Sequence, residues 1–340
     1  MKLFDRRHVL RPFQYPELYE MFEKAVQAHW HWNEISMDAD ADDFKYRLSD
    51  VQRHVIVRLL RSFTQIEVDA EDFWAKVAQW FPHAEARMMA STNSATEAVH
   101  IAGYDYLNRQ LNVSESEYSA FLDDPAIMAK KNNLGKILDD TDTPEGKAIA
   151  LAVFSAFTEG VSLFASFSIL VSFSQAGMMK GLANIIAWSA RDESHHSVCG
   201  IWLFNQLIHE YPELMTKDFE EKIYAAARTT VEIEDGVIDG IFEMGDIQYV
   251  SKEALKNFVR QRTNTKLQDI GFKPIYSSID QASVVTITGW FDAFLSREHA
   301  DIFSTESSSY AKGLMNFGGI DWKLLKDRFA AKKHTTGSEG

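Results

Sequence analysis

Two copies of the motif Glu-x-x-His stand far apart in the chain. The first contains Glu97 and His100, within EAVH, and the second contains Glu193 and His196, within ESHH. A spacing of three residues places both side chains on one face of a helix, where both can bind one metal ion. One such motif arises often by chance, but two copies on helices with apolar faces predict a pair of metal ions held between helices.

A site of this kind needs a carboxylate from each of two further helices. Glu159 is the single charged residue in the most apolar stretch of the chain, so we expect it to be protonated, paired or bound to metal. The other helix offers Glu67, Asp69 and Glu71. Glu67 follows Phe63 by four residues and so lies on the apolar stripe, whereas Asp69 falls on the wet face. We choose Glu67, with Glu71 as the alternative near the entrance of the site.

The charges of this set balance. Four carboxylates carry four negative charges, which two divalent ions neutralise, and two neutral imidazoles complete the ligands. A set rich in oxygen and free of sulfur suits iron or manganese better than zinc or copper. The alternative is a group of unrelated buried polar residues, but the order Glu, Glu-x-x-His, Glu, Glu-x-x-His argues against it. The predicted ligands are Glu67, Glu97, His100, Glu159, Glu193 and His196.

Helical periodicity recurs along the chain, and no alternating strand pattern of any length is present. Ser49 and Asp50 form a good N-cap pair for a long helix, which Pro82 ends. We therefore predict an all-α, ferritin-like helical bundle with additional helices over residues 1–303, and a flexible C-terminal tail over 304–340. The predicted helices cover Pro16–Trp32, Ser49–Trp80, Ala84–Leu111, Pro125–Leu138, 148–177, Lys180–His209, 216–246, 251–268 and 279–300.

The stretch from Ala148 to Gly177 is long and apolar enough to span a bilayer. Its middle carries Glu159 and its serines recur, and a carboxylate at the centre of a bilayer is costly. A helix buried on all sides in a large bundle explains the stretch better. We therefore expect no membrane span.

Composition narrows the possible partners and location. The net charge of −14 repels nucleic acid and anionic membranes, so we expect neither to bind. Cys199 is the only cysteine, which excludes an internal disulfide and suits a reducing compartment. The N-terminus, MKLFDRRHVL, lacks the apolar core of a signal peptide. These features predict a cytoplasmic protein.

Beyond the ligands, several motifs resemble those of the radical-generating small (beta) subunit of class I ribonucleotide reductase, from about residue 15 to 312. The run RDESHH (191–196) resembles that family's R-D-E-x-x-H signature, and HWHWNEIS resembles its W-x-x-x-E element. The run SSSYAKG (307–313) resembles its tail motif. The resemblance implies that Trp30 is the family's buried tryptophan and that Asp192 bridges Trp30 and His100. It also implies that Tyr104 occupies the position of the radical tyrosine and that Tyr310 is the relay tyrosine of the tail.

The resemblance implies a reaction that is divided between this chain and a second protein. A dinuclear centre of manganese, iron or both, activated by oxygen or a reduced oxygen species, would make and store a one-electron oxidant here. The oxidant would pass through Trp30 and Tyr310 to a cysteine of the large (alpha) subunit, where ribonucleoside diphosphates are reduced. The resemblance also implies a homodimer, docking to the large subunit through the C-terminal tail, and leaves a flavoprotein activator open.

Two residues depart from the commonest pattern of that family. The best-known tyrosyl-radical members have Asp as the first ligand, whereas the position here is Glu67, as in groups resembling the manganese–iron and dimanganese variants. Around Tyr104, matching offsets place Leu163, Phe167 and the polar Ser189. The resemblance therefore favours an oxidant held on a manganese-containing centre over a stable radical on Tyr104.

Two other functions would share these ligands. A ferritin-like ligand-binding oxidase or hydroxylase needs neither Tyr310 nor the Trp30–Asp192 pair. An iron-storage protein would bind many metal ions rather than two per chain. Deletion of 304–340 separates the first from a reductase subunit, and metal stoichiometry separates the second.

Overall fold

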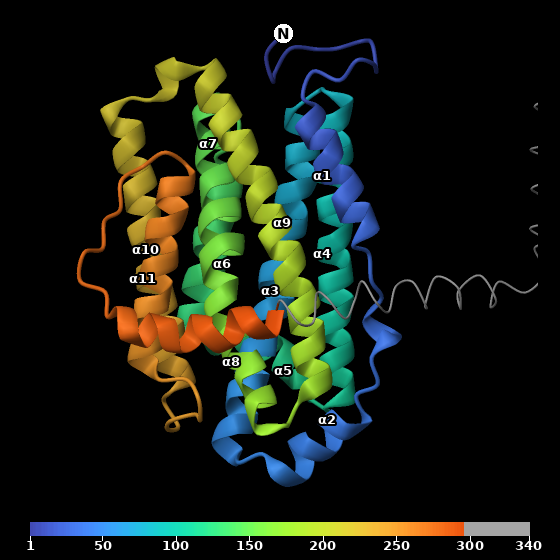
Figure 1. The fold of residues 1–340 in the computed structure, drawn as a ribbon, viewed down its shortest axis with the longest axis vertical. Helices are drawn as coiled ribbons and strands as arrows, with labels where there is room; N and C mark the ends of the chain where they lie inside the picture. The colour runs from blue at the N-terminus through green and yellow to red at the C-terminus, as the bar shows by residue number, and fades with distance from the viewer. Residues whose placement is uncertain (296–340) are drawn as a thin grey trace, which may run out of the picture. The chain divides into compact units, whose positions relative to one another are not determined.

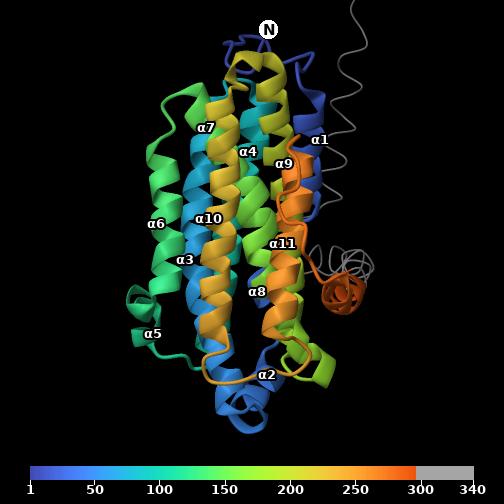
Figure 2. The same ribbon diagram turned by 90° about the vertical axis from the view of Figure 1, so that its left-hand side faces the viewer.

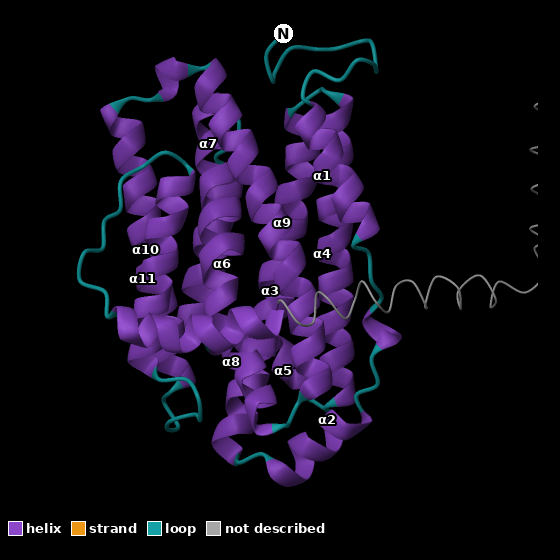
Figure 3. Cartoon of the chain, viewed as in Figure 1, coloured by secondary structure: helices purple, strands orange, loops and turns teal. Residues whose placement is uncertain are grey.

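A computed structural model describes residues 1–295 of the chain, which lie within one compact unit. These residues are almost entirely helical, and no β-strand occurs among them (Figure 3). The all-α prediction is confirmed. The main helices are α1 (Pro16–Gln27), α3 (Asp50–Trp80), α4 (Ala84–Gln110), α6 (Pro125–Asp139), α7 (Pro144–Leu151), α8 (Leu163–Ser172), α9 (Lys180–Glu210), α10 (Lys217–Ile241) and α11 (Lys252–Asp269), with the short α2 (Asp38–Asp42) and α5 (Glu115–Ser119), and residues 281–295 form a last helix.

Four elements run side by side through the middle of this unit (Figures 1 and 2). They are α3, α4, α9 and the continuous helical run from α7 to α8. Helix α1 covers α4, while α10 and α11 cover the run between α7 and α8. The helix over 281–295 lies across the bundle axis (Figures 1 and 2). The apolar faces of these elements form one continuous core.

Local sequence explains where several helices begin. At α3 the Ser49 hydroxyl accepts a hydrogen bond from the Gln52 backbone N–H, and the Gln52 side chain accepts one from the Ser49 N–H. This reciprocal capping box satisfies two N–H groups that the helix cannot pair itself. At α6 the Asp124 carboxylate alone acts as the cap, accepting from the backbone N–H groups of Ala126 and Ile127 just after Pro125.

Helix α9, which carries one Glu-x-x-His motif, has no side-chain cap of its own. Its first N–H groups are satisfied from α2, because the Asp40 carboxylate accepts from Gly181 at 3.1 Å and from Leu182 at 2.7 Å. Asp43 accepts from Met179 at 2.9 Å. A carboxylate at a helix N-terminus also interacts favourably with the helix dipole. The start of α9 is therefore fixed by a segment about 140 residues earlier in the chain.

The predicted buried helix over 148–177 is not one regular α-helix. Between α7 and α8 lies a π-helix, Ala152–Ser162, in which every residue is buried. Such segments are rare and occur often at functional sites. A stretch that is apolar on all sides has no stripe whose period could distinguish π from α geometry, so the sequence did not reveal it.

The same run is the one candidate membrane span among residues 1–295. By length and composition, Pro144–Ala176 could cross a bilayer, and 94% of its most apolar window is buried inside the protein. That burial favours the interpretation of a core helix.

Two predicted helix ends were wrong, and some other predictions fall outside the described residues. The first helix ends at Gln27 rather than Trp32, because Trp30 leaves the helical path to bury its ring in the core. The helix predicted over 216–246 ends at Ile241, and Gly245 beyond it has a φ of +132°, far from helical values. Tyr310, the division at 303/304 and the end of the helix predicted over 279–300 lie outside the described residues.

Candidate metal centre

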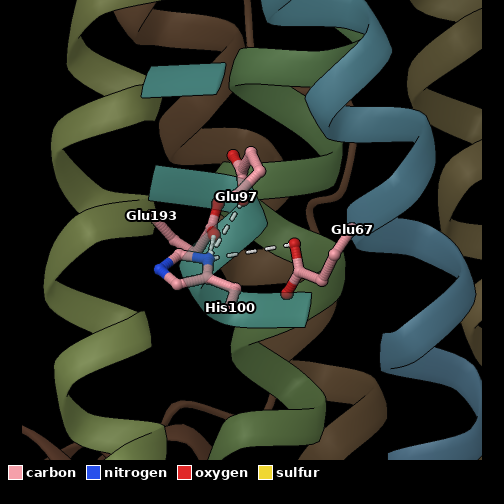
Figure 4. Close-up of side chains that lie close together, drawn as sticks. All are labelled: Glu67, Glu97, His100 and Glu193. Carbon is pink, nitrogen blue, oxygen red and sulfur yellow. Dashed lines mark ion pairs between the residues drawn. The ribbon is translucent and has the colours of Figure 1, made fainter. Parts of the chain in front are cut away.

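The structure brings the six predicted ligands together in the middle of the bundle. Glu67 comes from α3, Glu97 and His100 from α4, Glu159 from the π-helix, and Glu193 and His196 from α9. All six side chains are buried, none more than 1% exposed. Figure 4 shows Glu67, Glu97 and Glu193 converging on the ring of His100 from three helices. Their role as ligands stays a prediction, but their proximity is observed.

Two carboxylates each face both histidines. Glu97 places Oε2 3.0 Å from His100 Nδ1 and Oε1 2.7 Å from His196 Nδ1. Glu193 places Oε1 2.9 Å from His100 Nδ1 and Oε2 3.7 Å from His196 Nδ1. Each carboxylate therefore divides its two oxygens between the two imidazoles, which is the arrangement of bridging ligands between two ions.

The other two carboxylates lie at opposite ends of the cluster. Glu67 Oε2 is 4.0 Å from His100 Nδ1, and Glu159 Oε1 is 4.0 Å from His196 Nδ1. Two sets of four potential donor atoms result, and within each set all atoms lie within 4.8 Å of one another. The sets are Glu67, Glu97, His100 and Glu193, and Glu97, Glu159, Glu193 and His196.

Without metal, this cluster would be electrostatically unfavourable. Burial raises the pKa of Glu67 and of Glu159 well above the ordinary value, and neighbouring carboxylates raise both further. Burial acts to lower the pKa of His100 and His196, but the surrounding carboxylates outweigh it and raise both well above the ordinary value. Burial would likewise raise the pKa of Glu97, yet the two histidines lower it below its usual range. In the absence of metal ions, protons on the glutamates and histidines therefore reduce the negative charge that divalent cations would otherwise neutralise.

The orphaned atoms of the cluster fit a pair of metal ions. Buried polar atoms are nearly always hydrogen-bonded, and leaving one unpaired costs about 1–3 kcal/mol. Here nine buried nitrogen and oxygen atoms make no hydrogen bond of good geometry, although some of them lie as close as 2.7 Å to one another. The lone pairs of these atoms converge on a small region, which suits the coordination of metal ions. The atoms are both carboxylate oxygens of Glu67, Glu97 and Glu193, Oε2 of Glu159, and Nδ1 of His100 and His196.

A hydrogen-bonded chain leads away from His100. Its Nε2 lies 3.3 Å from Asp192 Oδ2, and the same oxygen accepts a hydrogen bond of 2.7 Å from the Trp30 indole N–H. Burial acts to raise the pKa of Asp192, but the His100 contact, Arg191 and Trp30 lower it below the ordinary value. The ring of Trp30 lies 5.2 Å from that of Trp188, which is partly exposed. Asp192 therefore contacts both Trp30 and His100, and its other oxygen accepts a hydrogen bond of 3.1 Å from Arg191.

Tyr104 is fully buried beside the Glu67 end of the cluster. Its ring stacks on Phe63 at 5.1 Å, and Phe63 stacks on Phe167 at 5.2 Å. Burial and the Glu67 charge raise the pKa of Tyr104 well above the ordinary value, and Ser189 acts in the opposite direction. Phe167 therefore lies one ring beyond Tyr104, Leu163 is buried, and Ser189 is the polar residue that acts on the Tyr104 hydroxyl.

Glu71, Asp69 and Cys199 do not belong to the donor sets. Glu71 belongs to neither donor set, and Asp69 pairs with Lys131 at 2.9 Å. Cys199 is buried and its thiol pKa is raised to about 12, as expected for a small core residue rather than a nucleophile.

Sequence reasoning missed Trp74, whose indole N–H donates a hydrogen bond of 2.6 Å to Glu159 Oε1. Trp74 lies seven residues after Glu67, two turns along the same face of α3. That spacing could have placed it near the site, but a tryptophan on an apolar stripe is ordinarily core.

The fold and the cluster define a class: helical-bundle proteins that hold a carboxylate-bridged dinuclear metal centre between four helical elements. Comparison with known proteins narrows it. The family model described as "Ribonucleotide reductase, small chain" matches residues 7–282. The chain is also 33% identical to a protein of Invertebrate iridescent virus 3 described as a probable ribonucleoside-diphosphate reductase small subunit, over 95% of this chain and 89% of that one.

Solved structures share the fold. One is the dimanganese(II)-NrdF of Streptococcus sanguinis, with a TM-score of 0.73, 19% identity, and coverage of 84% of this chain and 99% of that one. Another is the Rnr4 homodimer of Saccharomyces cerevisiae, with a TM-score of 0.69, 18% identity, and coverage of 82% and 87%. The family match covers most of the chain, so this protein belongs to the family of ribonucleotide reductase small chains.

Proposed function

We propose that this chain makes and stores a one-electron oxidant at its buried cluster and delivers it to the large subunit of a class I ribonucleoside-diphosphate reductase. The observation that carries the proposal is the continuous contact from the donor sets through His100 and Asp192 to Trp30. When bound, two manganese or iron ions supply the reaction with oxygen or a reduced oxygen species, and with it the oxidising power.

The residues of the chain have separate tasks. Glu97 and Glu193 would bridge the two ions, Glu67 and Glu159 would bind one each, and the histidines would each bind through Nδ1. Because His100 contacts Asp192 through Nε2, its ring orientation is fixed with Nδ1 toward the cluster. The Asp192 carboxylate can accept the indole proton of Trp30 when that ring loses an electron, which couples proton and electron movement. Burial of the whole cluster excludes water.

We further propose that the oxidant resides on a manganese-containing centre rather than on a stable Tyr104 radical. Glu67 in place of aspartate and the polar Ser189 near Tyr104 support this, whereas the aromatic stack on Tyr104 would protect a radical. Elemental analysis and an EPR spectrum of the activated protein test the choice. A sharp tyrosyl signal that Tyr104→Phe abolishes would overturn it.

The proposal extends to partners and location. The large subunit would dock through the segment 304–340, where Tyr310 would relay the oxidant, and the chain would act as a homodimer in the cytoplasm. A flavoprotein could supply the reduced oxygen species.

The test is nucleotide reduction by the metal-loaded chain mixed with a class I large subunit. Full-length protein should support reduction of a nucleoside diphosphate, and deletion of 304–340 should abolish it without lowering metal content. Nucleotide reduction that the truncated chain supports as well as the full-length chain, or no reduction with the full-length chain, would contradict the proposal.

A further inference from the structure

The two ends of the metal centre are chemically unequal. At one end both oxygens of Glu67 lack a hydrogen-bond donor. At the other end the Trp74 indole N–H donates to Glu159 Oε1 at 2.6 Å, so that only Oε2 is left without a partner. Among residues 1–295, this indole is the only hydrogen-bond donor that the Glu159 carboxylate has. One end therefore has a carboxylate without a hydrogen bond, and the other end has a carboxylate with one oxygen hydrogen-bonded.

Trp74 is held firmly in place. It is fully buried, and its ring meets the ring of His196 edge-on at 5.7 Å. Phe73 contacts it at 5.0 Å and stacks in turn on Phe154 of the π-helix at 4.5 Å. On the α9 side, a Cβ at Gly200 would lie 3.6 Å from the Trp74 ring, an ordinary packing distance. The indole N–H therefore has little freedom to point elsewhere.

Glu159 has little else to hold its carboxylate. It lies within the π-helix, whose backbone is restrained nearby by Arg262, because the Arg262 Nε–H donates to the Gly160 carbonyl at 2.8 Å. That bond fixes the main chain and does not reach the Glu159 carboxylate. The direction of the carboxylate is set by Trp74.

We propose that Trp74 is a positioning residue that holds Glu159 as a one-oxygen donor and so makes the two metal positions unequal. The inference rests on the dinuclear centre of the proposed function. The same tryptophan contacts the two ligands that belong to one position alone, Glu159 by a hydrogen bond and His196 by its ring edge. Loss of the indole N–H should therefore weaken the binding of one metal ion and leave the binding of the other unchanged. Loss of a hydrogen bond to a metal ligand typically weakens metal binding about 10–100-fold.

The experiment removes only the N–H group. Position 74 receives 3-benzothienylalanine, in which sulfur replaces the indole N–H and the shape of the ring system is kept. The metal-free full-length chain is titrated with Mn(II) against a chelating dye, which resolves the two binding steps. Trp74→Phe serves as the genetically simple variant. Trp80→Phe is the matched control, because it is the same change on the same helix and no contact joins Trp80 to the ligands.

The expected result is one Mn(II) affinity weaker by about 10–100-fold and the other unchanged in the benzothienyl protein, with Trp80→Phe like the wild type. Two wild-type affinities in the benzothienyl protein would overturn the inference, even if Trp74→Phe is defective, because packing alone would then explain that defect. Failure of the wild type to bind two ions would instead refute the dinuclear centre itself.

Discussion

Metal binding should displace several protons from the buried cluster. In the metal-free protein the pKa values of Glu67 and Glu159 are raised by burial, and those of His100 and His196 are raised by the carboxylates around them. Glu97, whose pKa is lowered by the two histidines, stays ionised. Four of the six ligands can therefore carry a proton that two divalent ions would replace.

The size of the effect follows from this count. Two protonated histidines and two protonated glutamates together hold up to four protons that can leave when the ions bind. Each proton that the folded state binds and the unfolded state lacks changes the free energy of unfolding by about 1.4 kcal/mol per pH unit.

The sign is the same for all four groups. Every folded-state pKa is raised, so the extra protons stabilise the folded state at low pH, and this stability is lost as the pH rises through the raised values. The loss begins above the ordinary pKa of glutamate for Glu67 and Glu159, and above that of histidine for His100 and His196. The metal-free protein should therefore become less stable between about pH 6 and pH 8.

Calorimetric titration with Mn(II) in two buffers of different ionisation enthalpy measures the protons released. At about pH 6 we expect more than two and up to four protons per chain for two bound ions. Glu67→Gln removes one of the titrating groups and should release about one proton fewer at saturating metal. Glu71→Gln is the matched control, because Glu71 lies one turn away and belongs to neither donor set.

One outcome would refute the reasoning directly. If the protein binds two ions and releases one proton or none, the cluster is already ionised without metal. Burial would then not dominate its electrostatics. A metal-free protein whose free energy of unfolding rises over the same pH range would contradict the sign.

Three further changes have defined outcomes. Lys130→Met leaves the buried Glu234 without its ion-pair partner, which lies 2.9 Å away. It should lower the free energy of unfolding, measured in urea, by about 3–5 kcal/mol. The double variant Lys130→Met/Glu234→Leu should restore most of this loss. Arg262→Met removes the donor to the Gly160 carbonyl and should cost about 1–3 kcal/mol, with faster amide hydrogen exchange in the π-helix. The Asp192→Asn variant should still bind both metal ions, as measured by elemental analysis. Its rate of nucleotide reduction with the large subunit should fall at least about 10-fold. An unchanged rate would exclude Asp192 from the relay.

The sequence predicted the parts of the site that local periodicity determines. Glu97 with His100, and Glu193 with His196, follow from a three-residue spacing on a helix, and Glu67 follows from its place on the apolar stripe of α3. Glu159 was identifiable because an isolated carboxylate in an apolar stretch needs a partner.

Contacts between distant segments could not be predicted in this way. The Asp40 carboxylate that caps α9 lies in a short acidic helix whose sequence does not show what it contacts. The bond from Trp74 to Glu159 joins positions 85 residues apart. It depends on the π-helix, and the uniformly apolar sequence gives no period from which that geometry could be inferred.

The two tryptophans beside the centre differ in a way that gives the proposed transfer a direction. Trp30 is joined to His100 through the ionised Asp192, so an electron and a proton can leave its ring together. Trp74 contacts His196 only by its ring edge, and its N–H is directed at Glu159, itself a predicted ligand. A proton from Trp74 would therefore have to go to a carboxylate needed for metal binding. The His100 side is suited to pass an oxidising equivalent outward, and the His196 side is suited to hold a ligand still.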